Sequence, residues 1–99
     1  MKIHIRARSV HVTDVLRNHV VRQLGLTLGR FGGSVTRVKC ALSGTGCEVE
    51  AVLSPGRVLA HDRDPDLFVA VDHAAARLGR SVGRALEHGQ DPPRAKERS

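Results

Sequence analysis

Two runs of alternating residues, joined by a short turn, constrain the fold of this chain more than any other feature. Apolar side chains take every second position in residues 38–42 and again in residues 47–53. The intervening Ser43-Gly44-Thr45-Gly46 is typical of a tight hairpin turn. A two-residue loop predicts three cross-strand pairs, namely Leu42 with Cys47, Cys40 with Val49, and Lys39 with Glu50. Because this register places the apolar side chains on one face, we expect a sheet with one buried side.

The amino terminus shows the same period of two. Across residues 2–8, small or branched apolar side chains alternate with basic and histidine side chains. This pattern predicts a strand with one buried face and one basic face. The buried face takes Ile3, Ile5 and Ala7, and the basic face takes Lys2, His4, Arg6 and Arg8.

A helix should follow this strand. Thr13 or Asp14 can cap it by accepting hydrogen bonds from the free N–H groups of its first turn. Its buried stripe comprises Leu16, Val20 and Leu24, and we expect it to end at Gly32-Gly33.

A second, longer helix is predicted near the carboxyl terminus, at about residues 65–88. Before it, Ser54-Pro55-Gly56 turns the chain into a strand at residues 57–61, and the pattern leaves the inward side of that strand open. We expect Asp64 to cap the helix and Asp66 to face the positive end of its dipole. The expected buried stripe is Leu67, Val71, Ala75, Leu78, Val82 and Leu86.

These elements follow the order β-α-β-β-β-α. The chain has 99 residues and a mass of 10.7 kDa, enough for one hydrophobic core. We therefore predict a single α+β domain over residues 1–90, a four-stranded sheet with two helices packed on one face. Residues 91–99 are polar and rich in proline, and we interpret them as a tail.

The charge of the chain points to an anionic partner. Sixteen Lys and Arg residues, thirteen of them arginine, exceed ten acidic residues, and the net charge is +6. Residues 1–30 alone hold six cations, Arg22 and Arg30 among them, against one acid. Only Phe31 and Phe68 are aromatic, which disfavours single-strand binding by stacked aromatic side chains.

The sharpest signal is a basic stripe on the second helix. His73, Arg77, Arg80 and Arg84 fall on the side opposite the predicted apolar stripe, and no acid lies between residues 77 and 84. A surface helix usually gains about 0.2–0.5 kcal/mol from each i,i+4 ion pair, which this stripe forgoes. A solvated helix face is one interpretation. The second basic set, on the first strand, favours a phosphate-binding surface.

Catalytic and metal sites are not indicated. His61, Asp62, Asp64 and Asp66 contain metal-ligand types, but the two last acids already have capping roles and no matching Cys or His spacing accompanies them. Cys40 and Cys47 fit small buried core residues. We expect no enzyme, cofactor or small-molecule substrate. No apolar run approaches the roughly 20 residues of a membrane span, and the amino terminus is unlike a signal peptide, so we expect a cytoplasmic protein.

The residues resemble a known family, the ribosome hibernation-promoting factors, or ribosome-associated inhibitors of translation. Residues 5–13 and 16–20 resemble its opening strand and first helix. Residues 47–56 and 58–60, followed by Asp66-Leu67-Phe68-Val69-Ala70-Val71-Asp72, resemble its second signature. Together these stretches cover residues 1–90 in register.

The resemblance implies a fold similar to a double-stranded-RNA-binding domain with an added leading strand. It also implies binding to the rRNA of the small ribosomal subunit, where messenger and transfer RNA would lie, and inhibition of translation in stress or stationary phase. The family's basic positions fall on Arg8, Arg77, Arg80 and Arg84. Gln23, Leu26 and Thr27 stand where relatives often carry Lys or Arg. The chain resembles short members, which lack the dimerisation domain of the long ones.

Three other interpretations remain open. A generic module for structured RNA would share the fold and the charge. A small enzyme on a ferredoxin-like sheet would need a closing strand after the second helix, for which residues 89–99 are too polar. A protein-interaction domain using an exposed sheet edge would bind in a manner that survives high salt. For RNA contact we expect Arg8, Arg77, Arg80, Arg84, Lys2, Arg6, Arg22 and Arg30.

Overall fold

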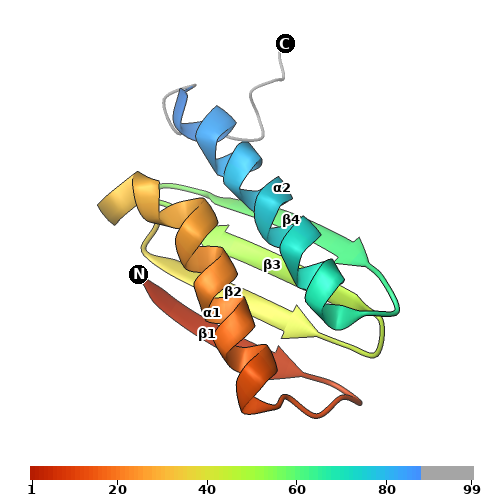
Figure 1. Ribbon diagram of the computed structural model, residues 1–99. Coiled ribbons are helices and arrows are strands. Elements are labelled where there is room, and N and C mark those ends of the chain that lie inside the picture. Colours follow the sequence, from red (N-terminus) through yellow and green to blue (C-terminus); the bar gives the residue numbers. More distant parts are fainter. Residues whose placement is uncertain (88–99) are drawn as a thin grey trace.

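The computed structural model describes residues 1–87 as a sheet covered on one face by two helices (Figure 1). The elements are β1 (Lys2–Ala7), α1 (Asp14–Leu28), a 3-10 segment (Gly29–Ser34), β2 (Arg37–Leu42), β3 (Gly46–Val52), β4 (Arg57–Arg63) and α2 (Leu67–Glu87). The strand order is β1-β2-β3-β4, with β1 parallel to β2 and the other neighbours antiparallel. The predicted α+β fold is confirmed. The predicted tail lies outside the described residues.

The register of the β2–β3 hairpin is the predicted one. Leu42 is opposite Cys47, Cys40 is opposite Val49, and Lys39 is opposite Glu50. The Ser43 amide donates to the Gly46 carbonyl at 3.0 Å and closes a two-residue loop. The apolar side chains of the hairpin consequently all face the helices.

The core lies between the sheet and the two helices. Of the predicted stripes, Leu16, Val20 and Leu24 of α1 and Val71, Ala75, Leu78 and Val82 of α2 are buried. Leu67 and Leu86 are only partly buried, because they lie near the two ends of α2. In β1, Ile3 and Ile5 pack against the core, whereas Ala7 is exposed where the strand ends.

The start of α1 was predicted correctly and its end was not. Thr13 is the cap, and its hydroxyl oxygen accepts a hydrogen bond from the Leu16 amide at 3.1 Å. The helix ends at Leu28, four residues before Gly32, because the chain tightens into the 3-10 segment. Gly32 has a φ of 56° and breaks the helical path there.

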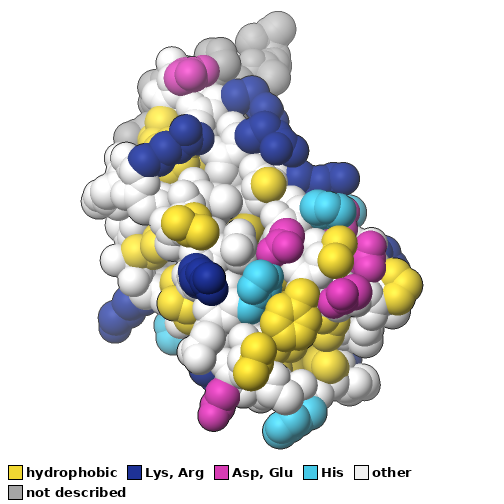
Figure 2. All heavy atoms as spheres, viewed as in Figure 1, with side chains coloured by type: hydrophobic (Ala, Val, Ile, Leu, Met, Phe, Trp, Pro, Cys, Tyr) yellow, Lys and Arg dark blue, Asp and Glu magenta, His cyan; other side chains and the backbone are white. Residues whose placement is uncertain are grey.

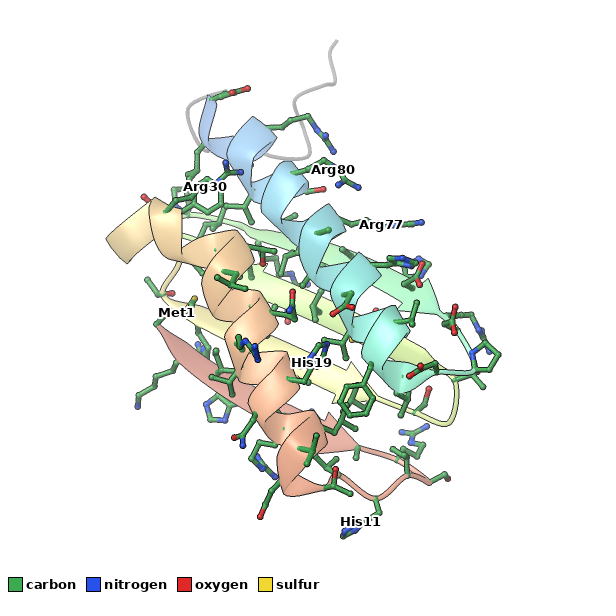
Figure 3. All side chains as sticks on the ribbon, viewed as in Figure 1. Met1, His11, His19, Arg30, Arg77 and Arg80 are labelled. Atoms are coloured by element: carbon green, nitrogen blue, oxygen red, sulfur yellow. The ribbon has the colours of Figure 1, made fainter. Side chains whose placement is uncertain are left out.

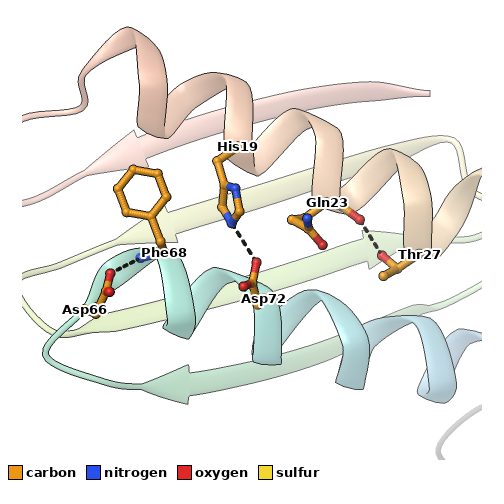
Figure 4. Close-up of polar contacts among 6 residues, drawn as sticks. All are labelled: His19, Gln23, Thr27, Asp66, Phe68 and Asp72. Carbon is orange, nitrogen blue, oxygen red and sulfur yellow. Dashed lines mark hydrogen bonds and ion pairs between the residues drawn. The ribbon is translucent and has the colours of Figure 1, made fainter.

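The start of α2 differs from the prediction by two residues. Asp66 is the cap in place of Asp64, since the Asp66 carboxylate accepts from the Phe68 amide at 2.9 Å (Figure 4). The Asp64 carboxylate instead accepts from the Asp66 amide at 2.9 Å. This contact closes a turn over Pro65, so the helix begins only at Leu67.

The structure settles the orientation of β4. This strand extends to Arg63, two residues beyond the prediction, and Ala60 is buried against the helices. Asp62 faces the same side as Ala60, because side chains alternate along a strand. Leu59 and His61 are exposed on the other side. The sequence left this open because Val58, Leu59 and Ala60 form one continuous apolar run.

The two helices approach each other closely at Gly79. A Cβ atom at that position would lie 3.0 Å from the Thr27 carbonyl oxygen and 3.2 Å from the Thr27 Cβ. The Thr27 hydroxyl donates to the Gln23 carbonyl of its own helix at 3.0 Å, and this bond holds the side chain along α1 (Figure 4).

Across residues 1–87, neither helix is long and apolar enough to cross a bilayer.

Candidate nucleic-acid interface

Three arginines of α2 surround one shallow hollow beside β4. Arg77, Arg80 and Arg84 are exposed, and they line the hollow together with His61 and Ser81. Arg77 and Arg80 project away from the helix axis in Figure 3. They do so because residues three and four apart share one helix face, and the opposite face packs on the sheet. The three arginines of the predicted stripe are therefore solvent-facing and border a shallow hollow, whereas His73 lies outside it.

A carboxylate on β4 holds the first half of this stripe. Asp62 contacts His73 through Oδ2 at 3.2 Å and Arg77 through Oδ1 at 3.5 Å. The Asp62 side chain is only 13% exposed, while that of Arg77 is 55% exposed. One edge of the Arg77 guanidinium is therefore fixed against the sheet, and the remainder faces solvent. The sequence did not reveal this role, because the continuous apolar run of Val58, Leu59 and Ala60 hides which side of β4 faces α2.

The second half of the stripe is differently supported. Within residues 1–87, Arg80 makes no ion pair. The Arg84 guanidinium donates to the Ser81 hydroxyl at 3.3 Å. Figure 2 shows the same division across the surface: basic side chains gather over the carboxyl-terminal half of α2, and acids and histidines lie around its amino-terminal half.

Arg30 lies next to α2, although it follows α1 in the chain (Figure 3). Its guanidinium lies over the Phe31 ring, 4.6 Å from the ring centroid. A Cβ at Gly83 would lie 3.6 Å from Arg30 Nη2, which locates that nitrogen beside the carboxyl-terminal half of α2. The fold thus brings Arg30 to the same end of the molecule as Arg84.

The remaining predicted residues are not gathered into the hollow. Arg6 and Arg8 line a second hollow at the end of β1, with Arg63, Glu48 and the shared residue His61. Lys2 lies at the other end of β1, opposite Arg37. Arg22 is exposed on α1. The eight predicted residues therefore form several basic regions and not one.

A contact between the helices sets the position of α2. His19 Nε2 on α1 lies 2.6 Å from Asp72 Oδ1 on α2 (Figure 4). The Phe68 ring lies against the His19 ring, with centroids 5.0 Å apart and planes tilted by 57°. These contacts join the amino-terminal halves of the two helices. They therefore fix the part of α2 that precedes the three arginines.

Cys40 and Cys47 are buried in the core, with their sulfur atoms 3.8 Å apart. The hydrogen bond with Cys47, together with burial, raises the pKa of the Cys40 thiol. Cys40 thus stays protonated at neutral pH. Among residues 1–87, no three metal-ligand side chains are grouped to hold an ion.

Comparison with known proteins places this arrangement in a family. The family described as sigma 54 modulation protein / S30EA ribosomal protein matches residues 3–89. The chain belongs to this family. This confirms the resemblance to hibernation-promoting factors. No curated protein matches the chain by sequence.

Two solved structures have the same fold. The N-terminal domain of Protein Y from Thermus thermophilus is 29% identical, with a TM-score of 0.76 over 85% of this chain and 98% of that one. A ribosomal subunit interface protein from Coxiella burnetii is 16% identical, with a TM-score of 0.72 over 88% of this chain and 99% of that one. The first supports family and fold, and the second shows the fold alone.

Proposed function

We propose that this protein binds the small ribosomal subunit through rRNA phosphates and occupies the channel used by messenger and transfer RNA. Its effect is to reduce translation in stress or stationary phase. The action is steric and needs no catalysis and no cofactor, and it takes place in the cytoplasm. Membership in the S30EA ribosomal protein family supports this proposal.

The observation that carries the proposal is the arginine-lined hollow beside β4. Arg77 and Arg84 are seven residues apart, or about 10 Å along a helix axis. Over that length, a nucleic acid strand carries more than one phosphate. Guanidinium groups bind phosphate oxygens in a bidentate manner, and a concave surface allows several of them to reach one backbone.

The size of the domain and its dispersed cations suit a protein that fills the RNA channel. Its Cα atoms extend over 41 × 25 × 17 Å, with a core that ties both helices to the sheet. Arg6, Arg8, Lys2, Arg22 and Arg30 distribute further positive charge over other surfaces. A compact domain with dispersed cations can contact rRNA on several sides and exclude other RNA from the space it fills.

Co-sedimentation with purified small subunits tests the proposal. We expect binding that weakens steeply between about 50 and 200 mM salt, because counterion release drives it. Messenger RNA with initiator transfer RNA should displace the protein, and the protein should inhibit translation of a reporter message. Equal affinity for subunits and for free duplex RNA of similar length would instead identify a generic structured-RNA binder. Binding that does not change with salt would contradict the electrostatic basis.

A further inference from the structure

The open face of the sheet carries basic side chains directly opposite one another. Both helices cover the other face, so the side chains at the outward positions of β1 and β2 are exposed. The parallel register sets Lys2 opposite Arg37 and His4 opposite Lys39. Lys2 and Arg37 are like charges, and like charges directly opposite in a sheet repel each other, so this pair lowers the stability of the fold.

One cross-strand row contains no acid at all. From β1 to β4 it runs Lys2, Arg37, Val52 and Arg57. The acids of the open face lie on β3, Glu50 in the next outward-facing row and Glu48 in the row after it. Neither β1 nor β2 contains an acidic residue.

On the open face, Glu50 forms its ion pair in the β3–β4 half of the sheet. Glu50 lies opposite Lys39 and makes an ion pair with Arg57 at 3.1 Å. Lys2 and Arg37 make no ion pair with any residue from 1 to 87. The β1–β2 half of the open face is therefore the less neutralised half.

We propose that the open face is a second RNA-binding surface, in which Lys2, Arg37 and Arg57 of one row, with Lys39 beside them, bind backbone phosphates. The inference rests on the proposed function and adds residues of β2 and β4 to it. Adjacent strands are about 4.8 Å apart, so the row spans about 14 Å across the sheet. An RNA backbone crossing the strands would meet Lys2 and Arg37 on β1 and β2 and, on β4, Arg57, whose guanidinium also contacts Glu50. Bound phosphate would also relieve the repulsion between Lys2 and Arg37.

The chemistry of the face favours RNA over an acidic protein. Protein interfaces usually contain an apolar centre, with charged residues depleted there. On the open face, the large apolar side chains at outward strand positions are only Val52 and Leu59, and they lie in different rows. A flat, basic and largely polar surface fits a phosphate backbone.

The test compares Arg37→Gln with Arg17→Gln, which removes an equal charge from an exposed position on α1. Binding to small subunits and to deproteinised rRNA is measured across a salt series, together with thermal unfolding. We expect Arg37→Gln to weaken both interactions severalfold, to flatten the salt slope by about 0.7–0.9, and to leave the melting temperature equal or higher. Arg17→Gln should change the slope much less.

Several outcomes overturn the inference. If Arg37→Gln and Arg17→Gln weaken binding equally, net charge alone is responsible. A loss seen with whole subunits but absent with deproteinised rRNA would assign the face to an acidic protein. Arg37→Lys keeps the charge and should bind nearly as wild type, so a binding loss shared by both Arg37 variants with a lowered melting temperature would show a structural role. If the wild type itself does not bind subunits, the proposed function fails, and that result is distinct from all of these.

Discussion

The two halves of α2 use charge differently. In the amino-terminal half, the charged side chains contact other elements: Asp72 meets His19 of α1, and His73 and Arg77 meet Asp62 of β4. In the carboxyl-terminal half, Arg80 has no ion pair within residues 1–87, and Arg84 donates to Ser81 of its own helix. The first half attaches the helix to the fold, and the second half presents cations to solvent. Arg77 belongs to both groups, because it contacts Asp62 and also lines the hollow with Arg80 and Arg84, to which we assign binding.

The largest expected effect comes from changing Arg77, Arg80 and Arg84 together to glutamine. Folding should survive, because all three are exposed and lie opposite the buried stripe. Affinity for small subunits should fall by roughly tenfold per lost phosphate contact at about 0.1 M salt, and the salt slope should flatten by up to about 0.9 per contact. Co-sedimentation beside a circular-dichroism melt measures both quantities. The corresponding triple lysine variant separates charge from bidentate geometry.

Arg77→Gln alone should weaken binding without abolishing it, because other cations share the phosphates. A folded triple glutamine variant that still pellets with ribosomes and inhibits translation would remove the distinction between the two halves of α2.

The next effect concerns stability. His19→Ala removes the contact with Asp72 and the packing on Phe68, and it should lower the free energy of unfolding by about 1 kcal/mol, since both partners are partly exposed. Subunit binding by the folded protein should be unchanged. Chemical denaturation measures the first quantity, with Asn18→Ala on the exposed side of α1 as the control. If the folded variant binds subunits more weakly, the amino-terminal half of α2 also takes part in binding.

Asp62→Asn tests the boundary between the halves. His73 and Arg77 would lose their shared carboxylate, so we expect a stability loss of about 1 kcal/mol or less. Binding to rRNA should tighten by a few fold, because the basic surface gains one net charge. Fluorescence anisotropy with labelled rRNA fragments measures this change. Asp14→Asn on α1 makes the same change in net charge away from α2 and should have a smaller effect. Weaker binding by Asp62→Asn would show that Asp62 positions Arg77 and that its charge does not oppose binding.

The smallest effect on binding is expected at the buried cysteines. Replacing Cys40 and Cys47 with alanine should cost modest stability through lost packing and leave ribosome association intact. In the wild type, both thiols should react slowly with iodoacetamide until the protein unfolds, because they are buried and the pKa of Cys40 is raised. Mass spectrometry follows the reaction. Rapid labelling of the folded protein would reveal an opening of the β2–β3 core that the packing does not indicate.

The sequence predicted features that depend on local periodicity. The β2–β3 register followed from a two-residue loop and alternation, and the buried stripes of both helices followed from helical spacing. The cap of α2 was misplaced because Asp64 and Asp66 are both competent caps, and only the turn over Pro65 selects between them.

Features that depend on contacts between distant segments were not predictable. The pairing of Asp62 with His73 and Arg77 requires knowing which side of β4 faces α2, and the apolar run there conceals it. The opposition of Lys2 and Arg37 requires knowing that β1 pairs with β2 in parallel. Both depend on which elements lie side by side, and periodicity within one segment does not show this.

The missing side chain at Gly79 has a consequence for RNA recognition. A methyl group there would lie 3.0 Å from the Thr27 carbonyl oxygen, so the two helices would have to separate by a few tenths of an ångström. Arg30 approaches Gly83 across the same interface, one turn further along α2. Moving α2 outward would therefore widen the gap between Arg30 and the arginines beside β4. The absence of a side chain at position 79 therefore helps to set the spacing between Arg30 and the arginines beside β4.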